Sequence, residues 1–73
     1  MNEFVAHLEN LPAPETSRFW IQKAARYLAE CSEPRYLMAA ATCLAEAAQG
    51  APEPLRRHLF SLKAELERRA FAT

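Results

Sequence analysis

Glycine and aspartate are what this 73-residue sequence most nearly lacks, with a single glycine, Gly50, and no aspartate. A loop that cradles phosphate needs several glycines, so that kind of nucleotide site is excluded. No serine stands in a G-x-S-x-G turn, which excludes the nucleophile elbow of the α/β-hydrolases. We therefore expect a protein that is not an enzyme, with no catalytic residue and no cofactor.

Metal-ligand spacings are missing as well. His7 and His58 are far apart in the sequence. Neither stands at a spacing such as two histidines four residues apart or a C-x-x-C motif. His58 falls near the edge of an apolar ladder described below, which favours a half-buried structural histidine. The sequence therefore predicts no metal site.

Charge of one sign and long apolar runs are also absent. Nine basic and nine acidic residues give a formal net charge of +0, which argues against attachment to nucleic acid or membrane by bulk charge. The longest apolar run is about half of the roughly 20 residues that span a bilayer. The first apolar patch, Phe4 to Leu8, has no basic lead-in of the kind that signal peptides carry. We expect a cytoplasmic protein whose partner is another protein, not nucleic acid or a membrane.

Only two cysteines, Cys31 and Cys43, are present. In the helix pairing predicted below they lie about seven residues apart, or roughly 10 Å at a rise of about 1.5 Å per residue. A disulfide needs Cα atoms within about 7 Å. We therefore expect two free, buried thiols, which fit a reducing compartment.

What the chain does contain is a long helical pattern at Pro34–Gln49. Pro34 suits the first turn of a helix and Gly50 suits the residue just past its end. Two apolar ladders with steps of 4, 3 and 4 residues run along it: Tyr36, Ala40, Cys43 and Ala47, and Leu37, Ala41, Leu44 and Ala48. At about 100° per residue the ladders face directions roughly 100° apart. The opposite side is polar: Arg35, Thr42, Glu46 and Gln49. This pattern predicts a central helix with two buried faces.

Each ladder has a counterpart in a neighbouring segment: Leu55, Leu59, Leu62 and Leu66 follow, and Trp20, Ala24, Tyr27 and Cys31 precede. Antiparallel packing sets Leu44 opposite Leu59 and Tyr27 opposite Ala40, so that large residues often meet small ones. The second helix should begin between Pro14 and Ser17 and end near residue 31. The last should open in the APEP segment, residues 51–54. The sequence predicts an all-α fold, a small antiparallel three-helix arrangement that forms one domain over residues 1–73.

A short N-terminal helix is predicted ahead of these three. Asn2 can cap it, and Pro12 ends it. Its apolar residues share one side: Phe4, Val5, Leu8 and Leu11. At two to three turns such a helix cannot stand alone, so it must dock on its own bundle or on another molecule.

The back of the last helix carries the candidate partner-binding residues. Phe60, Ala64 and Phe71 lie about 130–170° away from the leucine ladder. A charged rim flanks them: Arg56, Arg57, Glu67 and Arg68. Aromatic residues with a rim of arginine are typical of interface hot spots. The alternative interpretation is that the first helix folds across and covers them.

Self-association follows from the same geometry. The two apolar ladders of the central helix face directions about 100° apart, whereas the two contact directions of a helix in a closed three-helix bundle are roughly 60° apart. The neighbouring helices should therefore be splayed, which predicts a groove between the second and last helices. The first helix can fill that groove or cover Phe60 and Phe71, but not both. We therefore expect a homodimer or an obligate heteromer that buries those two rings.

Two functional hypotheses remain open. The leading one is a non-enzymatic protein–protein interaction module, such as a small regulator, inhibitor or co-chaperone, that docks a helical face on its partner. The excess of arginine over lysine, together with abundant alanine, is typical of GC-rich coding and favours a bacterial or phage origin.

The alternative is DNA binding through residues 44–59, LAEAAQGAPEPLRRHL. This stretch resembles a helix-turn-helix, whose usual pattern is L-A-x-x-x-G, a short polar turn, and an apolar residue six positions after the glycine. Here Ala45 and Leu55 each stand five residues from Gly50. Pro54 also removes a backbone donor from the turn.

Overall fold

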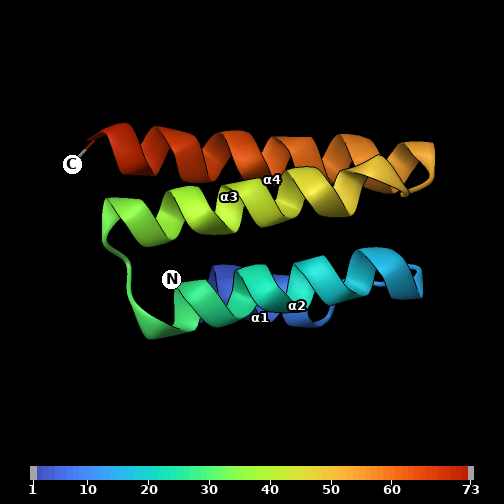
Figure 1. Ribbon diagram of the computed structural model, residues 1–73, viewed down its shortest axis with the longest axis horizontal. Coiled ribbons are helices and arrows are strands. Elements are labelled where there is room, and N and C mark those ends of the chain that lie inside the picture. Colours follow the sequence, from blue (N-terminus) through green and yellow to red (C-terminus); the bar gives the residue numbers. More distant parts are fainter. Residues whose placement is uncertain (1, 73) are drawn as a thin grey trace.

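The computed structural model describes residues 2–72, which form four helices in an up-down-up-down order (Figure 1). Their bounds are α1 Asn2–Glu9, α2 Glu15–Glu30, α3 Pro34–Gln49 and α4 Glu53–Ala72. No strand occurs among these residues. The predicted all-α arrangement with a short N-terminal helix is confirmed, and the central helix has the predicted bounds.

Prolines mark the helix starts. Pro14 precedes α2 in an extended conformation, with φ −59° and ψ 157°. Pro34 lies in the first turn of α3, where its missing N–H costs no helical hydrogen bond. Pro54 occupies the corresponding turn of α4. The sequence therefore sets these boundaries through residues that cannot continue a preceding helix.

The central position of α3 is visible in its burial pattern. Both predicted ladders face the interior, and the buried residues of α3 are Leu37, Ala40, Ala41, Cys43, Leu44, Ala47 and Ala48. The predicted polar stripe is exposed: Arg35, Thr42, Glu46 and Gln49. On α4, Leu59 and Leu66 are fully buried, while Leu55 and Leu62 are half-buried against the core. α3 packs on α2 along one face and on α4 along another.

The orientation of α2 differs from the prediction. Its most buried line is Ser17, Ile21, Ala24 and Leu28. The predicted ladder of Trp20, Ala24, Tyr27 and Cys31 is confirmed only in part: Ala24 is fully buried, Trp20 and Tyr27 are half-buried at the flank of the core, and Cys31 is half-buried.

Two contacts explain this rotation. The buried Ser17 hydroxyl donates to the Ala47 carbonyl at 2.8 Å, so a polar side chain enters the seam with its hydrogen bond satisfied. The Tyr27 ring packs edge-on against Tyr36, with 6.1 Å between ring centroids, one turn from the predicted partner, Ala40. Aromatic rings at the flank of the seam cover it while keeping one edge in water.

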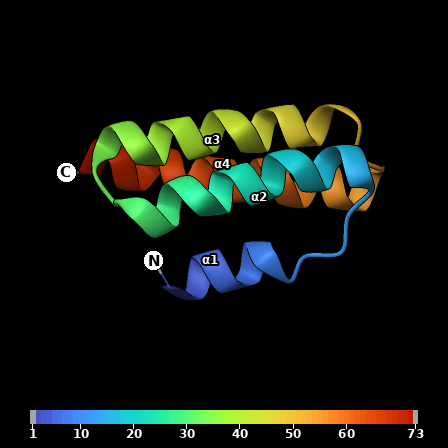
Figure 2. The ribbon, with the colours of Figure 1, turned by 60° about the horizontal axis from the view of Figure 1, so that its bottom comes forward.

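α1 lies in the groove between α2 and α4 and leaves a surface pocket on its α4 side. The Cα atoms of α2 and α4 stay more than 8 Å apart. α1 packs on α2 (Figure 2), and its Leu8 side chain is only 1% exposed. Of the two predicted positions for the first helix, the structure selects the groove.

Both cysteines are free thiols, as predicted. Cys43 is buried, but Cys31 is only half-buried, because it lies just past the end of α2. Burial raises the pKa of the Cys43 thiol above its ordinary value.

Candidate functional site

The back of α4 is the candidate site. Phe60 is 48% exposed and Phe71 is 80% exposed, and the half-buried Ala64 lies on the same side of the helix because the three residues are spaced 4 and 7 apart. The structure thus keeps these predicted residues on one face. It leaves the face open, so the alternative in which α1 covers the two rings is wrong.

The charges around this face are held by ion pairs within α4. Arg56 and Arg57 both bind the Glu53 carboxylate. Further along the helix, Lys63 donates to Glu67 at 2.7 Å. These solvent-accessible pairs add little stability. They do order the long side chains that surround the rings.

A second arginine pair repeats this arrangement further along. Arg68 and Arg69 both bind the Glu65 carboxylate, and their hydrogen bonds hold its pKa below the ordinary value. Each of the two clusters therefore has two arginines on one glutamate. Arg69 itself faces α1, so the apolar strip is flanked by Arg56 and Arg57 at one end and by Arg68 at the other.

Phe19 on α2 is an exposed aromatic residue that the sequence analysis missed. It is 60% exposed and packs edge-on against Trp20, with 5.2 Å between ring centroids. Lys23 lies over the same Trp20 ring at 5.3 Å. Phe19 and Trp20 are adjacent aromatic residues, and the sequence does not indicate which of the two side chains faces water.

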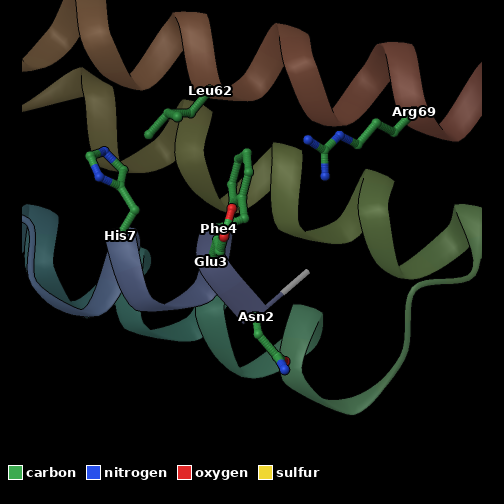
Figure 3. A pocket seen from close by; sticks show the side chains of 6 residues that line it. All are labelled: Asn2, Glu3, Phe4, His7, Leu62 and Arg69. Atoms are coloured by element: carbon green, nitrogen blue, oxygen red, sulfur yellow. The ribbon is translucent and has the colours of Figure 1, made fainter.

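Between α1 and α4 the structure forms a surface pocket of about 530 Å³. Figure 3 shows Phe4 and His7 reaching from α1 toward α4, where Leu62 and Arg69 face them. The Arg69 guanidinium lies over the Phe4 ring at 5.6 Å. A phenylalanine and an arginine thus link the two helices through a cation–π contact.

His7, which lines this pocket, also meets His58 of α4. Their Nε2 atoms are 2.8 Å apart, and the ring planes are inclined by 80°. His58 is half-buried, as predicted, while His7 is exposed. The two residues are 51 positions apart, so no local spacing in the sequence could have indicated their contact.

The predicted DNA-binding stretch, residues 44–59, forms the end of α3, a tight turn and the start of α4. α3 and α4 lie side by side and antiparallel (Figures 1 and 2). The two helices of a helix-turn-helix instead meet at about 90–120°. This hairpin geometry lends the DNA-binding hypothesis no support, and that hypothesis stays an untested prediction.

Comparisons of the chain with protein-family models, with curated proteins and with solved structures found no match. Within residues 2–72, none of the four helices combines the length and apolar content that crossing a membrane requires. No group of three or more His, Cys, Asp or Glu side chains in that range is arranged to hold a metal ion. The function is therefore inferred from the side chains described above.

Proposed function

We propose that the chain is a non-enzymatic protein–protein interaction module that docks the back of α4 on a partner protein. The observation that carries this proposal is the exposure of Phe60 and Phe71 on one helix face. An exposed apolar patch on a small domain usually marks a binding surface. Helix α1 is the segment of this chain that could have covered the two rings, but it packs on α2 instead.

The composition of the surface favours a protein partner. Its centre is apolar, and the small side chain of Ala64, between the two rings, would let a partner approach the helix closely. Its rim holds Arg56, Arg57 and Glu67, and protein interfaces combine an apolar, aromatic-rich centre with a polar rim. A small regulator, an inhibitor or a co-chaperone in the cytoplasm of a bacterium or a phage-infected cell would act through such a face.

The partner is a second copy of the chain or an obligate heteromeric partner. Two-fold dimers are the commonest assembly, since one self-complementary patch serves both subunits. A small domain also gains the most from association, because it buries only about 60% of its unfolded surface alone.

Light scattering tests this proposal, with Phe60→Glu as the diagnostic variant. The wild-type chain should show a dimer mass at micromolar concentration, and Phe60→Glu should shift it to the monomer while the helical circular dichroism is unchanged. Phe19→Glu is the matched control, because Phe19 is equally aromatic and exposed but lies on α2. It should leave the mass unchanged.

Affinity capture from the native host separates the remaining outcomes. Recovery of one specific protein by the wild type, and its loss with Phe60→Glu, would support the heteromeric form. A wild-type monomer that captures no protein would contradict the proposal. Recovery of DNA, with assembly unaffected by Phe60→Glu, would replace it with the helix-turn-helix hypothesis.

A further inference from the structure

His7 and His58 are the only histidines in the chain, and the fold brings their Nε2 atoms together from α1 and α4. The Cα atoms of these two helices stay more than 8 Å apart. Direct contact between α1 and α4 is therefore made by side chains, and this pair is one polar contact among them. Neither histidine belongs to the proposed partner-binding surface around Phe60 and Phe71.

The distance between the two nitrogens fits a shared metal ion. With metal–nitrogen bonds of about 2.1 Å, two imidazoles at a right angle around a metal have nitrogens about 3.0 Å apart, and at a tetrahedral angle roughly 3.4 Å. The observed separation is 2.8 Å. This separation is close to the right-angled arrangement of square-planar or octahedral ions, which is typical of Ni²⁺ and Cu²⁺. The ring centroids are 5.0 Å apart, so the rings point nearly head-on at each other and must tilt for both nitrogens to face one ion, a movement that the exposed His7 can make.

We propose that His7 and His58 form a two-imidazole site for a divalent transition-metal ion that ties α1 to α4. At 2.8 Å one ring donates its Nε2–H to the Nε2 of the other. To bind the metal, the donor ring moves that proton to Nδ1 and stays neutral, so both Nε2 lone pairs become available. Exposure of His7 gives the ion access from solvent.

Water completes the coordination shell. No third His, Cys, Asp or Glu joins the pair within residues 2–72, and a site with two protein ligands binds less tightly than a closed structural site with four. The ion therefore exchanges with solvent, and its effect depends on metal concentration. Because ligation requires neutral imidazole nitrogen, acidification should release it.

Thermal unfolding with and without Ni²⁺ tests the site in the full-length chain. Nickel should raise the wild-type Tm by roughly 5 °C at saturation, since an ion that binds only the folded state stabilises it. Titration calorimetry should give one ion per chain. His7→Gln and His58→Gln should each abolish the shift, because a single imidazole cannot chelate.

A relocated histidine provides the matched control. The double variant His7→Gln with Gln49→His keeps two histidines but places the second on the exposed stripe of α3, and it should show no shift. An unchanged Tm of the wild type in saturating nickel would overturn the proposal. A shift that persists in the single variants would also overturn it, since the ion would then bind elsewhere, for example at the thiols.

Discussion

Ser17 is the residue whose role depends most on the folded structure. Its hydroxyl donates to the carbonyl of Ala47, which lies in the last turn of α3, where carbonyls lack a helical partner. Ser17→Ala should therefore leave a buried acceptor unsatisfied and lower the free energy of unfolding by about 1–3 kcal/mol. Urea denaturation measures this. Ser61→Ala, at an exposed position of α4, is the control and should be nearly neutral. Equal midpoints for the two variants would contradict the assigned hydrogen bond.

The two thiols should differ in reactivity. Cys43 is buried, and its burial raises its pKa, so less of the reactive thiolate is present at a given pH. Cys31 is half-buried beyond the end of α2. In the native protein, an aromatic disulfide reagent should modify Cys31 first and Cys43 only slowly, and both should react at once in urea. Equal native rates would show that Cys43 is not enclosed by the α2–α3 seam.

At the level of the helix, α3 can be tested by adjacent substitutions. Ala41 is 1% exposed in the seam with α4, whereas the neighbouring Thr42 is exposed. Ala41→Leu should overpack the seam and lower the free energy of unfolding by about 1–3 kcal/mol. Thr42→Leu should be nearly neutral. Similar melting temperatures for these two variants would contradict the placement of α3 between its neighbours.

The same helix shows why sequence patterns predicted some elements better than others. α3 is bounded by Pro34 and Gly50 and has apolar residues on two faces, so its ends and its orientation both follow from the sequence. In α2 the pattern was ambiguous, because apolar residues fill more than one face. The predicted ladder was centred on Trp20 and Tyr27, which lie at the flank of the buried face. The decisive contact, from Ser17 to Ala47, spans 30 residues and leaves no local signature.

The whole molecule depends on how α1 is placed, and the sequence could not decide that. An eight-residue helix with one apolar side fits either the groove or the back of α4. The structure decides through contacts between distant residues, His7 with His58 and Phe4 with Arg69. Exposure of the partner-binding face is thus a consequence of where α1 docks. The candidate residues on α4 were predictable, because their spacing is local.

Leu8 tests whether α1 is part of the core or a removable cover. It is the fully buried residue of α1, and the α2 and α4 backbones do not contact each other directly. Leu8→Ala should therefore destabilise the whole domain, by about 2–5 kcal/mol. Glu9→Ala, an exposed neighbour, should have little effect. Urea denaturation combined with amide hydrogen exchange distinguishes the outcomes. If Leu8→Ala removed protection only in residues 2–9 and left the urea midpoint unchanged, α1 would be a separate cover. The groove beneath it would then be a second surface open to a partner.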